Sequence, residues 1–167
     1  MPGSLLDLRS QLRFYKFYHH NSVNVGIHSI FVPTILVFSA SLLHRIVLFD
    51  SFTLTHLLTI GYIVYYCLLS FPVGLLASSF LLLINVSLDQ KWLHTSLNQD
   101  LCIFTLSWIC QFIGHGFFEH KKPALLDNLV QSLVLAPYFI LFELLFKLGM
   151  FHELDIQLQN DIAMMSH

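Results

Sequence analysis

The feature that most restricts the fold is a run of 38 consecutive residues without Asp, Glu, Lys or Arg, between Asp50 and Asp89. A single helix that crosses the hydrocarbon core needs about 20 apolar residues, so this run is long enough for two crossings. Pro72 lies near its middle with Gly74 just after it, and a proline marks a boundary between helices. The run therefore predicts a helical hairpin in a membrane, with spans over residues 51–70 and 73–88.

Further apolar segments extend this prediction along the chain. They cover residues 25–43, which hold 19 residues without a charge, residues 101–118, and residues 128–147. The last of these is short and contains Pro137, so a short span, a re-entrant segment and an interfacial helix all remain open. The composition is 56% hydrophobic, far above that of an ordinary globular domain. We predict an all-α, polytopic membrane helix bundle with four or more spans, forming a single domain over residues 1–167.

The two ends of the chain are more polar. Residues 4–20 place Leu5, Leu8, Leu12 and Tyr15 at helical spacing beside Arg9, Arg13 and Lys16, which predicts an amphipathic interfacial helix. No small-residue cleavage site closes a short apolar segment here, so we expect the first span to act as an uncleaved signal anchor. Residues 152–167 are predicted to be a polar tail that frays.

Charge and cysteine content exclude several classes of function. The net charge is -2 and no basic block is interleaved with aromatic residues, so we expect no nucleic-acid partner. The three cysteines lie in apolar runs without a CxxC spacing. They therefore predict neither a disulfide framework nor a cysteine metal site.

The topology of the spans brings two distant segments to one membrane face. With four spans, the start of the first and the end of the fourth lie on the same side. Arg9, Arg13 and Lys16, together with Lys121 and Lys122, lie on that side. The excess of positive residues predicts that this face is cytosolic.

Ten histidines are many for 167 residues, and two segments on the predicted cytosolic face carry several of them. In the first segment, Gln111, His115 and Glu119 follow one another at intervals of four and fall on one face if the segment is helical. That face offers an imidazole and a carboxylate for a metal. The alternative interpretation is that His115 and Glu119 form a hydrogen-bonded pair that stabilises a helix end.

The second segment contains His19, His20, Asn24 and His28. On one continuous helix, His19 and His28 would point in opposite directions. Asn21 or Ser22 is a good helix N-cap, so a break near His20 would let His19 turn back toward His28. A single unbroken helix through residues 14–30 would contradict this hypothesis.

Together, His19, His28 and His115 offer three imidazoles at one membrane edge, with Glu119, His20 and Asn24 as further ligands or supporting groups. Imidazoles with an optional carboxylate suit Fe(II), Zn(II) or Cu(II). The alternative is a set of satisfied polar residues at the end of a helix bundle. For the other histidines we expect loop or interface roles: His44, His56, His94, His152 and His167.

The motifs Tyr18-His19-x4-Asn24-x3-His28 and Gln111-x2-Gly114-His115-x3-Glu119-x3-Pro123-Ala124-Leu125 resemble those of a membrane family. This is the family of the fungal endoplasmic-reticulum 2-hydroxy fatty acid dioxygenases of phytosphingosine degradation. The resemblance covers residues 5 to about 150 of the sequence.

The resemblance implies an Fe(II)-dependent oxidoreductase of the endoplasmic-reticulum membrane, which converts a 2-hydroxy fatty acid and O2 into a fatty acid one carbon shorter. It implies His19, His28 and His115 as iron ligands, and so favours His19 over His20. Asn24, Gln111 and Glu119 would surround the iron as catalytic residues. The acyl chain would lie among membrane lipid between spans.

Several other functions stay open from the residues alone. Lys121 and Lys122 could steer a carboxylate substrate, or could only set the orientation in the membrane. A small transporter or lipid-organising protein with histidines at helix ends is the non-enzymatic alternative. A zinc hydrolase fits the ligand types as well, whereas a di-iron desaturase would need more clustered histidines.

Overall fold

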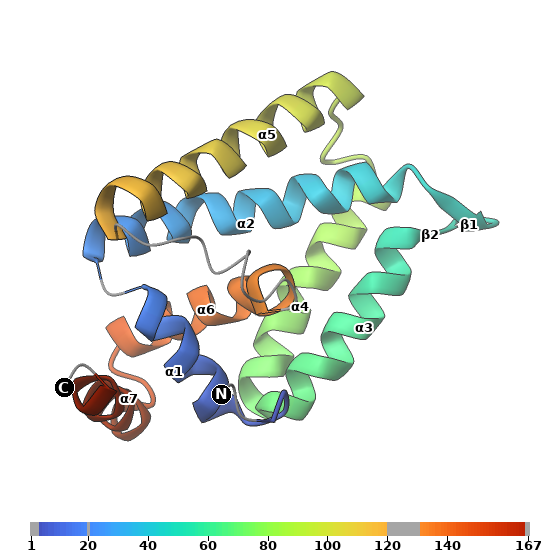
Figure 1. Ribbon diagram of the computed structural model, residues 1–167. Helices are drawn as coiled ribbons and strands as arrows, with labels where there is room; N and C mark the ends of the chain where they lie inside the picture. The colour runs from blue at the N-terminus through green and yellow to red at the C-terminus, as the bar shows by residue number, and fades with distance from the viewer. Residues whose placement is uncertain (1–3, 20, 120–130, 166–167) are drawn as a thin grey trace. The chain divides into compact units, whose positions relative to one another are not determined.

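The computed structural model describes residues 4–19, 21–119 and 131–165. Two compact units make up the chain, one formed by residues 1–29 and 111–167 and the other by residues 30–110. We call them unit 1 and unit 2 and describe each separately. The described residues are almost entirely helical (Figure 1), which confirms the all-α prediction.

Unit 1 is built around α1 (Leu8–Tyr18), α6 (Ala136–Lys147) and α7 (His152–Met165). The side chain of Asp7 caps α1 by accepting a hydrogen bond from the backbone N–H of Ser10. The core of the unit contains large apolar and aromatic side chains of these helices. They include Leu12, Tyr15, Tyr138, Phe139, Phe142, Leu145 and Leu158.

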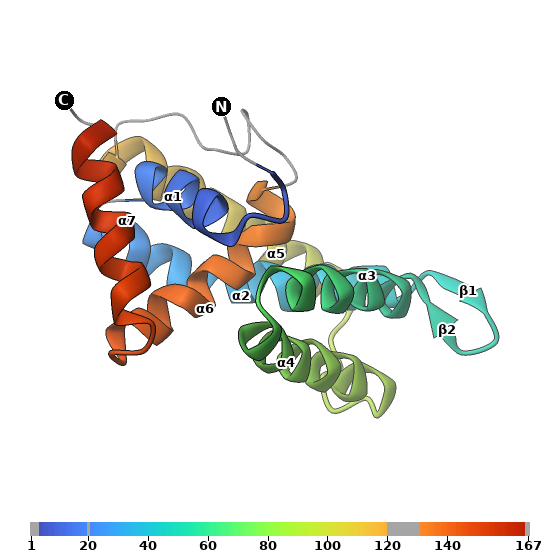
Figure 2. The ribbon, with the colours of Figure 1, turned by 90° about the horizontal axis from the view of Figure 1, so that it is seen from below.

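Residues 152–165 are helical, so the prediction of a fraying tail is wrong. Helix α7 lies beside α1 in Figures 1 and 2. Leu158 is fully buried, and two ion pairs join the helices, Arg9 with Asp161 at 2.9 Å and Lys16 with Asp155 at 2.6 Å. The segment looked like a tail because its many acidic and amide residues hide a narrow apolar stripe.

The described part of unit 1 also contains the π-helical segments η1 (Gly114–Glu119) and η3 (Gln131–Leu135). Pro137 occupies the first turn of α6, so it starts that helix rather than interrupting it. The predicted helix over residues 128–147 is thus observed from Gln131 onward, and residues 128–130 lie outside the described part. Whether this segment crosses the membrane stays a prediction.

Unit 2 contains most of α2 (Ser22–His44), the helices α3 (Leu54–Leu69) and α4 (Phe71–Asp89), and most of α5 (Leu97–Ile113). A short antiparallel hairpin, β1 (Val47–Phe49) with β2 (Phe52–Thr53), connects α2 to α3. Its turn residue Asp50 has φ 44°, a conformation that Asp tolerates better than most residues. This hairpin was not among the elements predicted from the sequence.

The predicted break between α3 and α4 is confirmed. Ser70 has an extended conformation and Pro72 lies in the first turn of α4. The two helices pack side by side (Figures 1 and 2). A Cβ at Gly74 would lie 2.6 Å from the backbone of Cys67, so only glycine allows the helices to approach this closely.

The span predicted over residues 101–118 starts just after Asp100, but α5 already begins at Leu97 and includes Asp100. Ser96 and Gln99 form reciprocal side-chain to backbone hydrogen bonds, an arrangement that starts a helix. Asp100 is fully buried, and it accepts hydrogen bonds from Ser41 and Arg45. Asp100 is therefore buried, although a charged residue next to a predicted span is normally exposed to solvent.

Within the described residues, three helical segments are long and apolar enough to cross a membrane, namely Ser22–His44, Phe71–Asp89 and Leu97–Glu119. A fourth is possible if the bent pair Leu133–Lys147 and His152–Met164 counts as one span. Helix α3 has only 16 residues, so a crossing by the predicted span 51–70 stays a prediction. Exposed apolar side chains along these helices suit a lipid environment, and we conclude that this is a membrane protein.

Candidate metal centre

The interruption of helical structure between α1 and α2 positions the first two histidines. Helix α1 ends at Tyr18, and His19 has the non-helical angles φ -128° and ψ 74°. Asn21 then caps α2, because its side-chain oxygen accepts hydrogen bonds from the N–H groups of Val23 at 2.9 Å and Asn24 at 3.4 Å. The prediction of two helices with an N-cap at Asn21 or Ser22 is confirmed.

Backbone carbonyls orient both of these imidazoles. His19 Nδ1 donates to the carbonyl of Tyr15 at 2.9 Å, and His28 Nδ1 donates to the carbonyl of Asn24, also at 2.9 Å. A carbonyl can only accept, so the proton of each neutral ring lies on Nδ1. The lone pair of each neutral ring therefore lies on Nε2, which is the usual preparation of a metal-binding histidine.

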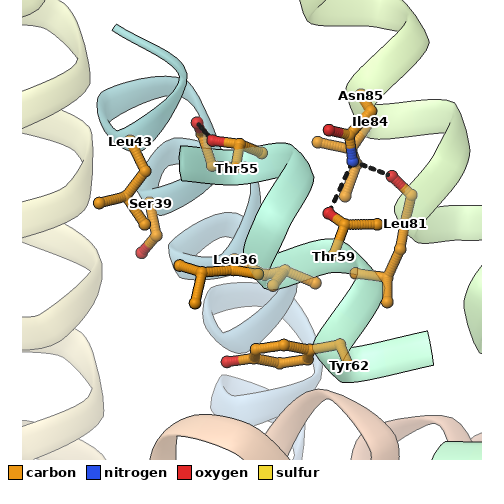
Figure 3. A pocket seen from close by; sticks show the side chains of 11 residues that line it. Leu36, Ser39, Leu43, Thr55, Thr59, Tyr62, Leu81, Ile84 and Asn85 are labelled. Carbon is orange, nitrogen blue, oxygen red and sulfur yellow. Dashed lines mark hydrogen bonds between the residues drawn. The ribbon is translucent and has the colours of Figure 1, made fainter. Parts of the chain in front are cut away.

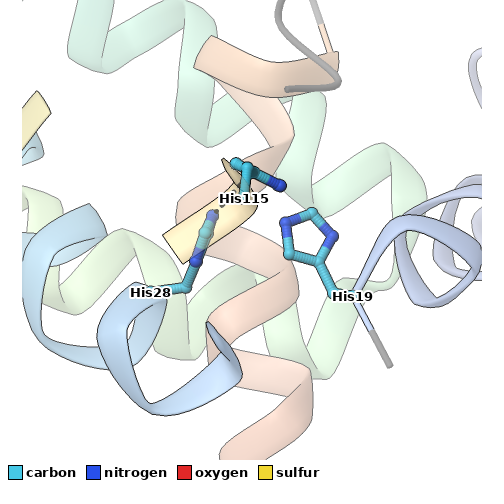
Figure 4. Close-up of side chains that lie close together, drawn as sticks. All are labelled: His19, His28 and His115. Atoms are coloured by element: carbon cyan, nitrogen blue, oxygen red, sulfur yellow. Dashed lines mark hydrogen bonds between the residues drawn. The ribbon is translucent and has the colours of Figure 1, made fainter. Parts of the chain in front are cut away.

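His115 lies in η1 and completes the group. Its Nε2 lies 3.1 Å from Nε2 of His28, and the centroid of its ring lies 5.0 Å from that of His19. Figure 4 shows the three rings together, from the end of α1, from α2 and from η1. Their exposed fractions are only 8% for His19, 4% for His28 and 5% for His115. Short π-helical turns such as η1 often occur at functional sites.

These three side chains fit a metal ion. One nitrogen from each ring lies within 4.8 Å of the others. Two nitrogens bound at right angles to one ion, each at about 2.1 Å, would lie about 3.0 Å apart, close to the 3.1 Å between His28 and His115. Nδ1 of His115 is buried and has no hydrogen-bond partner among the described residues. Such an unsatisfied atom in the interior is unusual for a site with a purely structural role.

Glu119 connects η1 to the start of α2. Its Oε1 accepts hydrogen bonds from the backbone N–H of Asn21 at 2.9 Å and from Nδ2 of Asn24 at 3.2 Å. The carboxylate thus lies at the N-terminus of a helix, where a negative charge is stabilised. Through Asn24, whose carbonyl holds His28, the carboxylate also supports the orientation of that ring.

Gly114 and Gln111 complete the surroundings of the histidines. A Cβ at Gly114 would overlap with the side-chain oxygen of Asn24, so this glycine lets η1 approach α2. Gln111 is buried, and its Nε2 has no hydrogen-bond partner in the described part of the chain. All six predicted site residues that the structure describes are therefore buried in unit 1, whereas His20, Lys121 and Lys122 lie outside the described residues.

Sequence reasoning missed the role of Tyr15. Its ring stacks on His19 with centroids 4.2 Å apart and an interplanar angle of 17°. Burial raises the pKa of Tyr15 well above its ordinary value, with the charges of Glu143 and Glu119 adding to the effect. The phenol is therefore neutral and fixes the His19 ring from one side. The helical spacing identified Tyr15 only as a residue of the apolar face.

Unit 2 contains a separate pocket, shown in Figure 3. Aliphatic side chains line much of it, among them Leu36, Leu43, Leu58, Leu81 and Ile84. On one wall, Asn85 donates hydrogen bonds to Thr59 at 2.7 Å and to the carbonyl of Leu81 at 2.9 Å. None of the site residues predicted from the sequence lines this pocket.

Comparisons with known proteins agree with these motifs. The model of a family described as "2-hydroxy-palmitic acid dioxygenase Mpo1-like" matches residues 5–148. The chain is 56% identical, over 162 residues, to the 2-hydroxy-palmitic acid dioxygenase MPO1 of Saccharomyces cerevisiae. This alignment covers 97% of the chain and 93% of the yeast protein. No solved structure matches the chain.

Proposed function

Because the chain belongs to the Mpo1-like family, we propose that it is a dioxygenase acting on 2-hydroxy fatty acids, with Fe(II) held by His19, His28 and His115. The observation that carries this proposal is the convergence of three buried imidazoles, with one nitrogen of each ring within 4.8 Å of the others. The name of the yeast relative supplies the substrate class. Phytosphingosine degradation and the endoplasmic reticulum are the corresponding pathway and location.

The proposed reaction balances without a second organic reductant. A 2-hydroxy acid, R–CH(OH)–COOH, and O2 give R–COOH, CO2 and H2O. The bond between C1 and C2 breaks, the O–O bond breaks, and the substrate itself supplies all four electrons that reduce O2. No 2-oxoglutarate is required.

Fe(II) would supply the activation of O2 and a binding point for the carboxylate and hydroxyl of the acid. The protein's contribution is to hold neutral imidazoles in place before the substrate arrives. The carbonyls of Tyr15 and Asn24 keep the protons of His19 and His28 on Nδ1. Since these acceptors belong to the backbone, the orientation does not depend on the rotation of other side chains.

Glu119, Asn24 and Gln111 would act around this centre. Glu119 and Asn24 keep η1 against the start of α2, so they act as positioning residues. Gln111 has a buried amide N–H group without a described partner, and we propose that it donates a hydrogen bond to the substrate. Lys121 and Lys122 would attract the carboxylate from the cytosolic side, where the many basic residues of the predicted face also lie.

The apolar composition of the helices fits a substrate with a long acyl chain. Burial of the chain between helices stabilises it relative to water by about 0.8 kcal/mol per methylene. Membrane lipid offers a similar environment, so the carboxylate and the 2-hydroxyl should dominate selectivity.

The test is anaerobic purification of the full chain in detergent, followed by metal analysis and by oxygen uptake with 2-hydroxypalmitate. We expect iron near one per chain and uptake that is lost in His28→Ala and His115→Ala. His94→Ala, which changes an exposed histidine of unit 2, is the matched control and should keep both. A protein without iron and without uptake would favour the non-enzymatic transporter or lipid-organising role, whereas zinc with oxygen-independent turnover would favour a hydrolase.

A further inference from the structure

A second group of side chains of the types that bind metals lies entirely within unit 2. His44 is the last residue of α2, His56 lies in the first turn of α3, and Asp89 ends α4. One ligand atom from each lies within 4.8 Å of the others. His56 Nε2 lies 3.2 Å from one carboxylate oxygen of Asp89, and His44 Nε2 lies 3.6 Å from the other.

Thr53 lies on the opposite side of both rings. Its hydroxyl oxygen is 2.8 Å from Nδ1 of His56 and 3.2 Å from Nδ1 of His44. One oxygen can accept hydrogen bonds from both Nδ1–H groups. If both rings carry their proton on Nδ1, two Nε2 lone pairs and a carboxylate face the same point, an arrangement that is favourable only with a positive charge between them. Histidines that bind metals commonly donate their other N–H group to such an acceptor.

We infer that His44, His56 and Asp89 form a binding site for a divalent metal ion of the zinc type. Two imidazoles and a carboxylate are suitable zinc ligands, and they leave a fourth position for water. In a tetrahedral site with bonds of about 2.0–2.1 Å, ligand atoms lie about 3.3 Å apart, between the 3.2 Å and 3.6 Å seen here. The ion would connect the ends of α2, α3 and α4.

The hydrogen bonds also indicate what zinc must displace. The backbone N–H of Thr53 donates to Nδ1 of His56 at 3.0 Å as part of the cap of α3. In that state the neutral His56 carries its proton on Nε2 and donates a hydrogen bond to Asp89. Zinc binding moves the proton to Nδ1, which then donates a hydrogen bond to the Thr53 hydroxyl. The site therefore exchanges one capping hydrogen bond for a metal ligand, and the Thr53 hydroxyl becomes essential for tight binding.

The exposure of the group permits an ion to enter. The side chains of His44 and His56 are 22% and 21% exposed, and that of Asp89 is 42% exposed. The group differs in this respect from the three buried histidines of unit 1. It shares no residue with them, so the inference does not depend on the proposed dioxygenase activity.

The test uses the full chain in detergent, depleted of metal and titrated with Zn²⁺, with thermal unfolding as the measurement. A ligand that binds only the folded protein raises its melting temperature. The His115→Ala background disables the centre in unit 1, so the remaining rise reports on unit 2. We expect Zn²⁺ to raise the melting temperature by several degrees in this background. The matched control His94→Gln, added to the same background, should show the same rise. The rise should disappear with His56→Gln or Asp89→Asn.

A second pair of variants addresses Thr53 and gives a result that a purely structural role would not produce. Competition with a chelating dye should show zinc affinity about 10–100-fold lower in Thr53→Val and nearly unchanged in Thr53→Ser. The inference is overturned if His56→Gln and Asp89→Asn, each in the His115→Ala background, bind zinc as tightly as the His115→Ala protein does. It is also overturned if zinc leaves the melting temperature of the His115→Ala protein unchanged, because the group is then only a set of hydrogen bonds joining helix ends.

Discussion

Replacement of Glu119 gives the sharpest test of how the histidine centre is held together. Glu119 is buried, and its Oε1 accepts hydrogen bonds from the Asn21 N–H and from Asn24 Nδ2. Each hydrogen bond to a charged group contributes about 1.5–3 kcal/mol. Water that enters the space left by the side chain recovers part of this, so we expect Glu119→Ala to destabilise the protein by about 2–4 kcal/mol.

The same substitution should weaken iron binding, because Asn24 also orients His28 through its carbonyl. Loss of a supporting contact around a metal site typically lowers affinity by about 10–100-fold. Glu119→Gln retains an acceptor oxygen without the charge, so its effects should be clearly smaller. The assays are thermal unfolding and competition for Fe(II) with a coloured chelator, with Glu153→Ala, an exposed carboxylate of α7, as the matched control.

Two results would refute this reasoning in different ways. If Glu119→Ala unfolds and binds iron like the unchanged protein, the carboxylate does not hold η1 against α2. If it loses oxygen uptake while stability and iron affinity are unchanged, Glu119 acts directly on the substrate and is a catalytic residue rather than a positioning residue.

Three further predictions follow from the structure. Gly114→Ala places a methyl group against the Asn24 side chain, and we expect a loss of about 1–3 kcal/mol in stability together with reduced iron content and oxygen uptake. Asp100→Ala removes the buried partner of Arg45 and Ser41. Because Arg45 is partly exposed and can regain water, we expect a loss of stability of about 2–3 kcal/mol, measured by thermal unfolding. The loss should be smaller for Asp100→Asn. Removal of the metal by a chelator should abolish oxygen uptake, and anaerobic addition of Fe(II), but not of Zn(II), should restore it.

Much of the candidate centre could be predicted from the sequence because its signals are local. Asn21 is a good N-cap wherever it occurs, so a helix break after His19 could be inferred from neighbouring residues alone. The regular spacing of Gln111, His115 and Glu119 likewise indicated that they share surroundings. The motifs then pointed to the family, and the comparisons confirmed it.

Contacts between distant segments could not be predicted in this way. The pairing of Glu119 with Asn21 and Asn24 joins residues more than 90 positions apart, and no local pattern specifies it. Asp100 was misplaced for the same reason, since an isolated acidic residue is normally solvent-exposed unless a partner such as Arg45 is brought to it. His44 and His56 were assigned loop or interface roles because no local pattern shows that the helix ends carrying them meet at Asp89.

The sequence by itself therefore determined the helical class, the membrane character and the α3–α4 break, because hydropathy and proline act along the chain. It also nominated the three histidines. Only the tertiary structure decided which nitrogen of His19 and His28 carries the proton, that α7 packs on α1, and that two separate groups of histidines exist. The physical reason is that hydrogen-bond geometry and burial depend on which elements come together, and a polar residue can be read as exposed or buried until its partners are known.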